Sequence, residues 1–148
     1  MAVAEVATAA EVDADSIPTA VDGCGVVTFA LPLERMAHAF ARLPQLAHAD
    51  RITAAMRAHP HLVGGADGAD VLLMTRTTSH IAKGGAEGLL CGVDLATNTG
   101  YTLKAEDGAF RALAPAAAAF LQIDLPPTLV RNTRGEVVGE VSLQNPEP

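Results

Sequence analysis

Apolar side chains recur at helical spacing in two stretches of the first half of the chain. Between Pro32 and Pro44 they fall three or four positions apart, which predicts a helix with charged residues on its opposite face. Proline suits the first turn of a helix and cannot continue one, so these two prolines mark its ends. A second helix is predicted over residues 49–58, and Pro60 ends it. Shorter helical segments are predicted at 3–12, 70–74 and 110–122.

Beyond residue 78 the pattern changes to short strands separated by glycine-containing turns. Strands are predicted over 79–83, 89–94 and 101–104, and the Thr97–Gly100 turn is a hairpin signal. A last strand is predicted over 137–143. Helices followed by a meander, then by another helix and strand, indicate an α+β fold in which helices pack on an antiparallel sheet.

Composition changes this picture in one respect. The 148 residues suit a single domain, 1–148, and 49% of them are hydrophobic, but only 3% are aromatic. Much of the apolar content is alanine, so each core residue buries little area. The chain therefore either packs its helices tightly on the sheet or needs a partner surface.

Charge and hydropathy exclude several classes of function. The formal net charge is −7 and there is no basic stripe, which argues against nucleic-acid binding. No apolar run approaches the roughly 18–20 residues of a membrane helix, and the first residues lack the positive region of a secretory signal. We therefore expect a soluble cytoplasmic protein, in which Cys24 and Cys91 are thiols rather than a disulfide.

Candidate chemistry centres on the stretch Ser79–Gly88, where one lysine, Lys83, precedes a glycine-rich turn. Glycine lets the backbone approach a ligand or another strand closely. A cation beside such a turn can meet a carboxylate or a nucleophilic hydroxyl, although many such lysines are simply exposed at the end of a strand. A second unusual stretch, Asp22–Gly25, places a cysteine between two glycines.

Several stretches together resemble the bacterial type II, or rhizobial-type, asparaginase family. They occur in the family's order over nearly the whole chain, at 17–18, 21–26, 29–33, 55–60, 62–63, 82–88, 103–108 and 130–139. The resemblance implies a fold similar to the C-terminal part of serine β-lactamases and glutaminases. It covers only the C-terminal part of the family, which implies that the N-terminal catalytic half is missing. The Ser-x-x-Lys and Cys-Ser-Gly-Lys-His motifs of that half do not occur in this sequence.

The resemblance also implies roles for individual residues. Lys83 matches a catalytic lysine, and a desolvated lysine can activate a serine hydroxyl as a base or as a cation. Gly84 and Gly85 would let backbone amides approach an oxyanion, and Glu87 would bind the substrate's ammonium group, unless it only caps backbone amides. Cys24 matches a zinc ligand, with Asp22 beside it. A tetrahedral zinc needs about four donors, so a small buried thiol is an equal alternative for Cys24.

The function that the resemblance implies is an amidohydrolase that converts L-asparagine to L-aspartate and ammonia. Because the nucleophile motif is absent, we expect the isolated chain to be inactive without the N-terminal half. The expected protein partner is a second copy of the chain, in a homo-oligomer, or a separate N-terminal half. The resemblance implies zinc as a cofactor, and neither nucleic acid nor membrane is an expected partner. The alternative is a non-catalytic interaction or regulatory module that retains the scaffold.

Overall fold

A three-stranded antiparallel sheet forms the centre of the protein in the computed structural model, which describes residues 2–144. Its strands are β3 (His80–Gly85), β4 (Leu89–Asp94) and β5 (Thr99–Lys104), in the order β3-β4-β5. The register pairs Ile81 with Val93 and Val93 with Gly100. The predicted meander is confirmed. Residue 1 and residues 145–148 of the predicted domain lie outside the described residues.

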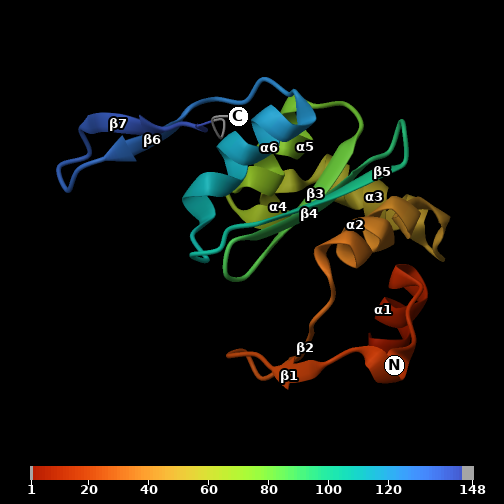
Figure 1. The fold of residues 1–148 in the computed structure, drawn as a ribbon. Coiled ribbons are helices and arrows are strands. Elements are labelled where there is room, and N and C mark those ends of the chain that lie inside the picture. The colour runs from red at the N-terminus through yellow and green to blue at the C-terminus, as the bar shows by residue number, and fades with distance from the viewer. Residues whose placement is uncertain (1, 145–148) are drawn as a thin grey trace.

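Helices cover both faces of this sheet (Figure 1). The bounds of the helices are α1 (Ala2–Ala10), α2 (Leu33–Arg42), α3 (Ala49–Ala58), α4 (Pro60–Gly64), α5 (Ala69–Arg76) and α6 (Leu113–Leu121). Helix α2 packs on β4 and β5, whereas α5 packs on β3 and α6 contacts both α5 and β5. The fold is therefore α+β, as the sequence predicts.

The core has two parts, because successive side chains of a strand point to opposite faces of the sheet. Ala82 and Leu90 are fully buried on the face where α5 and α6 pack. Ile81 and Val93 are fully buried on the other face, against residues of α2 and α3. Gly100 lies on this second face, so close to α2 that an added Cβ would stand 1.9 Å from the carbonyl oxygen of Ala37.

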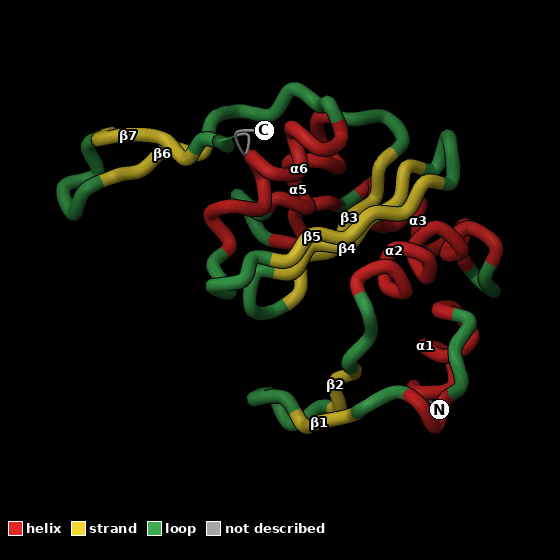
Figure 2. The backbone as a smooth tube through the Cα atoms, in the orientation of Figure 1, coloured by secondary structure: helices red, strands yellow, loops and turns green. Residues whose placement is uncertain are grey.

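Two hairpins project from this body (Figure 2). One pairs β1 (Thr19–Val21) with β2 (Val27–Phe29), and the other pairs β6 (Thr128–Arg131) with β7 (Val137–Val141). Among the described residues, neither hairpin packs extensively against another helix or strand. The sequence predicts β7 and the β-rich stretch of β2, but not β1 or β6, whose few residues are mostly exposed.

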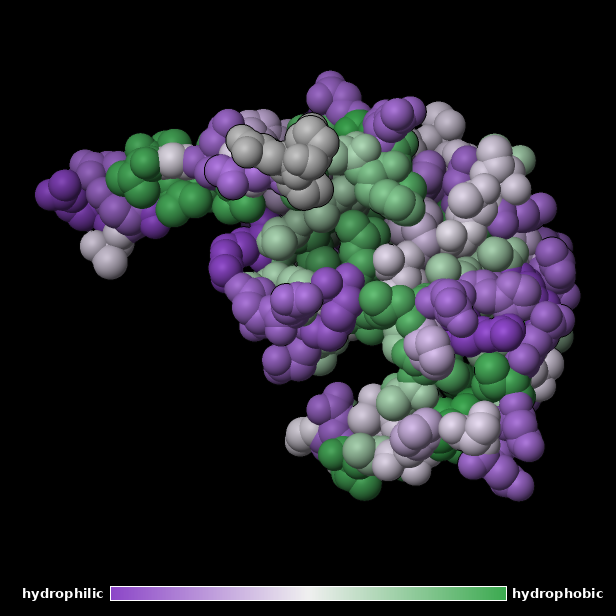
Figure 3. All heavy atoms as spheres, in the orientation of Figure 1, coloured by the Kyte–Doolittle hydropathy of each residue, from purple (hydrophilic) through white to green (hydrophobic). Residues whose placement is uncertain are grey.

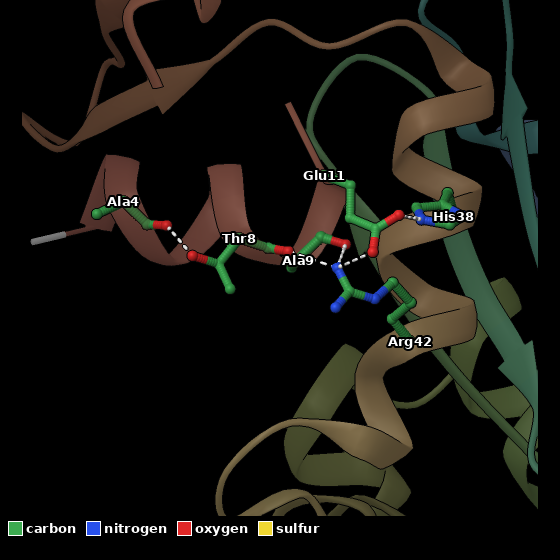
Figure 4. Close-up of polar contacts among 6 residues, drawn as sticks. All are labelled: Ala4, Thr8, Ala9, Glu11, His38 and Arg42. Atoms are coloured by element: carbon green, nitrogen blue, oxygen red, sulfur yellow. Dashed lines mark hydrogen bonds and ion pairs between the residues drawn. The ribbon is translucent and has the colours of Figure 1, made fainter. Parts of the chain in front are cut away.

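Polar contacts hold α1 against α2 (Figure 4). Arg42 donates to the carbonyl of Thr8 at 2.6 Å and lies 3.2 Å from the Glu11 carboxylate. His38 contacts the same carboxylate at 2.9 Å. The bond to His38, followed by the charge of Arg42, lowers the pKa of Glu11 below its usual value.

Other boundaries differ from the sequence expectations. Pro60, taken as the end of a helix, also begins α4, because proline is well suited to the first position of a new helix. The helix expected over 110–122 begins with a 3-10 turn, Phe110–Ala112, before α6. Within residues 2–144, no helix combines the length and apolar character that a membrane crossing requires.

Candidate functional site

A pocket of about 400 Å³ lies where the end of β3 meets the segment leading into α5. The consecutive residues Lys83, Gly84 and Gly85, which the sequence selects, all line it. Across the pocket lie Gly68 and Asp70 at the start of α5. The pocket adjoins a larger hollow of about 780 Å³ between α5, α6 and β6.

Lys83 stands at the rim of this pocket with an exposed side chain. Alternation along β3 places Lys83 and Gly84 on opposite faces of the strand. The Lys83 ammonium group folds back and donates to the carbonyl of Gly84 at 2.5 Å. The cation is therefore accessible and held beside the glycine turn.

Asp70 is a residue of this pocket that the sequence did not single out. Its side chain is only 3% exposed, and it is the buried charged residue of the described core. One carboxylate oxygen accepts from the Val71 amide at 2.9 Å and the other from the Gly84 amide at 2.8 Å. The glycine-rich segment just before α5 is the one sequence signal near Asp70. A glycine cluster of this kind predicts a loop, so it does not single out the carboxylate.

The Gly84 amide is consequently engaged by protein. It donates to Asp70, so it would have to leave that carboxylate before it could stabilise an oxyanion.

Glu87 does not line the pocket. Its φ is +57°, in the left-handed region, and its carboxylate lies beside Gly108, where an added Cβ would stand 2.7 Å from it. Lys104 donates to its carbonyl oxygen.

Cys24 and Asp22 lie on the turn of the β1–β2 hairpin, and neither lines the pocket of Lys83. Cys24 is an exposed free thiol, and Asp22 accepts from the Gly23 amide at 2.7 Å. In residues 2–144, no group of three or more His, Cys, Asp or Glu side chains could hold a metal ion. The donors that the described chain supplies thus do not fit a complete zinc site.

No hydroxyl or thiol side chain of the described residues lines the Lys83 pocket. Ser79, four residues before Lys83, bonds to the Asp94 carboxylate instead, and this bond is the main cause of the lowered pKa of Asp94. Ser16 donates to the carbonyl of Asp13 at 2.6 Å, in a 3-10 turn near the N-terminus. Among the described residues, the pocket therefore presents a cation and a buried carboxylate but no hydroxyl or thiol nucleophile.

Two further titratable groups belong to the sheet rather than to the pocket. Burial raises the pKa of Tyr101, whose hydroxyl lies 3.3 Å from Nδ1 of His80. Burial likewise raises the pKa of Cys91, 6% exposed within β4. The interpretation of Cys91 as a core residue is confirmed, and a protonated, enclosed thiol is a poor nucleophile.

Comparison with protein families matches residues 1–143 to a family model described as L-asparaginase II. This match extends over most of the 148-residue chain. No curated protein matches the chain significantly.

Proposed function

The chain belongs to the L-asparaginase II family, and we propose that it forms part of an amidohydrolase that converts L-asparagine to L-aspartate and ammonia. The family match and the position of Lys83 support this proposal together. Lys83 is one of two lysines in the sequence and stands, exposed, at the rim of a pocket built from the glycine turn. A small polar amide is of a size that such a pocket accommodates.

Lys83 would activate the nucleophile. A serine hydroxyl is weakly nucleophilic at neutral pH, and a neighbouring lysine can accept its proton or lower its pKa. The serine oxygen would attack the side-chain amide carbon, the C–N bond would break, and ammonia would leave with the transferred proton. Water would then cleave the acyl ester, releasing L-aspartate and restoring the hydroxyl.

The nucleophile would come from a polypeptide segment outside these 148 residues. The absence of Ser-x-x-Lys from the sequence and the lack of hydroxyl groups on the described pocket lining both favour this arrangement. A helix carrying Ser-x-x-Lys would place the serine and its lysine on one face, because residues three apart are neighbours on a helix. That face would have to approach the exposed ammonium group of Lys83.

Zinc has no assigned step in this proposal. Cys24 could supply one thiolate and Asp22 one carboxylate, which leaves about two donors of a tetrahedral site to come from another segment. If the nucleophile-bearing segment also carries zinc ligands, Cys24 would tie that segment to the β1–β2 hairpin.

The experiment is complementation. The purified chain is assayed for ammonia release from L-asparagine alone, and again after mixing with the Ser-x-x-Lys-containing half of a family member. We expect no turnover from the chain alone and measurable turnover from the mixture. Turnover by the chain alone would contradict the external nucleophile, and a stable complex that releases no ammonia would contradict the amidohydrolase.

A non-catalytic interaction module is the second candidate, and the two hairpins favour it. Valines on both are unusually exposed, including Val21 (72%), Val26 (63%) and Val138 (61%). Figure 3 shows hydrophobic residues gathered on the β6–β7 hairpin and an open notch beside the β1–β2 region. Such surfaces are typical of protein contacts. A stable assembly that binds no L-asparagine and releases no ammonia would support this candidate over the enzyme.

A further inference from the structure

The carboxylate of Asp70 occupies a cradle made by glycines from three segments. An added Cβ at Gly64 would stand 2.1 Å from its Oδ1 atom, and one at Gly68 would stand 2.3 Å from the same atom. An added Cβ at Gly84 would stand 3.3 Å from Oδ2. The first two distances are far below any ordinary contact. The glycine-rich segment before α5 is therefore shaped to admit this one carboxylate.

No ion pair among the described residues includes Asp70. Its charge is met by two backbone amides and by the first turn of α5, where helix geometry favours an anion. Burying a charge without a cationic partner costs free energy unless hydrogen bonds compensate for the lost water. Burial and these two hydrogen bonds therefore fix the position of the carboxylate relative to the Gly84 amide.

What Asp70 holds is the peptide unit next to Lys83. β3 is an edge strand, so some of its amides face away from β4, and the Gly84 amide is taken up by Asp70. The carbonyl of the same glycine accepts from the Lys83 ammonium group at 2.5 Å. Gly84 thus joins the buried anion at its N–H to the exposed cation at its carbonyl oxygen.

We propose that Asp70 is a positioning residue: through Gly84, its buried carboxylate fixes where β3 presents the Lys83 ammonium group. This inference rests on the proposed function only in giving Lys83 a catalytic task. The positioning itself is a property of the folded chain. A substrate or a serine that approaches Lys83 would meet a cation whose location is set from the opposite face of the strand.

The test uses the two lysines of the sequence, Lys83 and Lys104, as probe and internal reference. The folded chain is labelled with trace acetic anhydride, and peptide mass spectrometry gives the ratio of acetylation at the two side chains. Amide hydrogen exchange at Gly84 is measured in parallel. Asp70→Ala removes the acceptor and Asp70→Asn keeps one oxygen in place. Gly100→Ala, which strains the opposite face of the sheet, controls for general loosening of the fold.

In Asp70→Ala, exchange at Gly84 should accelerate by about tenfold or more because a hydrogen bond to a charged group is lost. The acetylation ratio of Lys83 to Lys104 should rise by about threefold as the bond to the Gly84 carbonyl loosens. In Asp70→Asn, the exchange rate and the acetylation ratio should both lie between those of Asp70→Ala and the unmodified chain. Gly100→Ala should leave the acetylation ratio unchanged.

An unchanged ratio in folded Asp70→Ala would overturn the proposal, as would an equal change in Gly100→Ala. If Asp70→Ala does not fold, the acetylation ratios of Asp70→Asn and Gly64→Ala test the proposal instead. The added methyl of Gly64→Ala displaces the carboxylate, so a ratio equal to that of the unmodified chain in both variants overturns the proposal. None of these readouts requires hydrolysis, so a failure to release ammonia would refute the proposed function and leave the role of Asp70 standing.

Discussion

Replacing Gly100 by alanine should destabilise the fold by forcing α2 away from the sheet. An added Cβ would stand 1.9 Å from the Ala37 carbonyl oxygen and 2.7 Å from the Ala41 amide nitrogen. Both atoms belong to the helix backbone, so no side-chain rotation can relieve the clash. Since ordinary contact begins near 3.4 Å, helix and strand must separate by about 1.5 Å at this point.

The expected magnitude follows from two opposing effects. Overpacking of a well-packed contact costs about 1–3 kcal/mol, and a backbone clash falls at the upper end. Removing a strand glycine returns about 0.5–1 kcal/mol, because alanine has less conformational freedom to lose on folding. The net loss should be about 2 kcal/mol, or a fall of about 4–8 °C in Tm for a chain of this size.

Urea denaturation followed by circular dichroism measures this loss directly. The matched control is Gly139→Ala on β7, where an added Cβ meets nothing within 4 Å. That variant should keep the stability of the parent chain or gain slightly. A Gly100→Ala chain within about 0.5 kcal/mol of the parent would refute the close packing of α2 on β5, because surface substitutions fall in that range.

Three further predictions test other parts of the structure. The pKa of Glu11 is lowered in the folded chain, so its contribution is present at neutral pH and is lost as pH falls through the folded value. Glu11→Gln should therefore speed hydrogen exchange in α1 at pH 7, and this effect should fade as pH falls through the folded pKa of Glu11. An effect that does not depend on pH would count against the Arg42 contact. Gly92→Ala should destabilise by about 1–3 kcal/mol in thermal unfolding, because its Cβ would stand 2.4 Å from the ring of buried Tyr101, and an unchanged Tm would contradict this packing. The chain alone should retain less than one zinc per molecule after dialysis, and a full equivalent that is lost in Cys24→Ala would show that it completes a site by itself.

The parts of the fold with strong local signals were predictable from sequence. The helix predicted over 49–58 coincides with α3, and the strand predicted over 89–94 coincides with β4. In both, apolar spacing and a following turn or proline agree on the same boundaries. β1 and β6 were missed, because three or four exposed residues carry no alternation that sequence reasoning can use.

Of the candidate site, the turn that carries Lys83 was predictable from the sequence, but Asp70 was not. The glycine turn around Lys83 is a local motif, and its consecutive residues Lys83, Gly84 and Gly85 line one pocket. Asp70 could not be found in this way, because its decisive partner, Gly84, lies 14 residues further along the chain. Only tertiary packing shows that a carboxylate at the start of α5 caps an amide of the sheet edge.

The most direct test of the central claim is the effect of Lys83→Ala on ammonia release in the complemented enzyme. Lys104→Ala is the matched control, since Lys104 lies on β5 and does not line the pocket of Lys83. If Lys83 activates the nucleophile, its loss should lower kcat by about 10²–10⁴-fold, the range typical of acid–base groups, while Lys104→Ala keeps most of the activity. Equal activity in the two variants would contradict a catalytic role for Lys83.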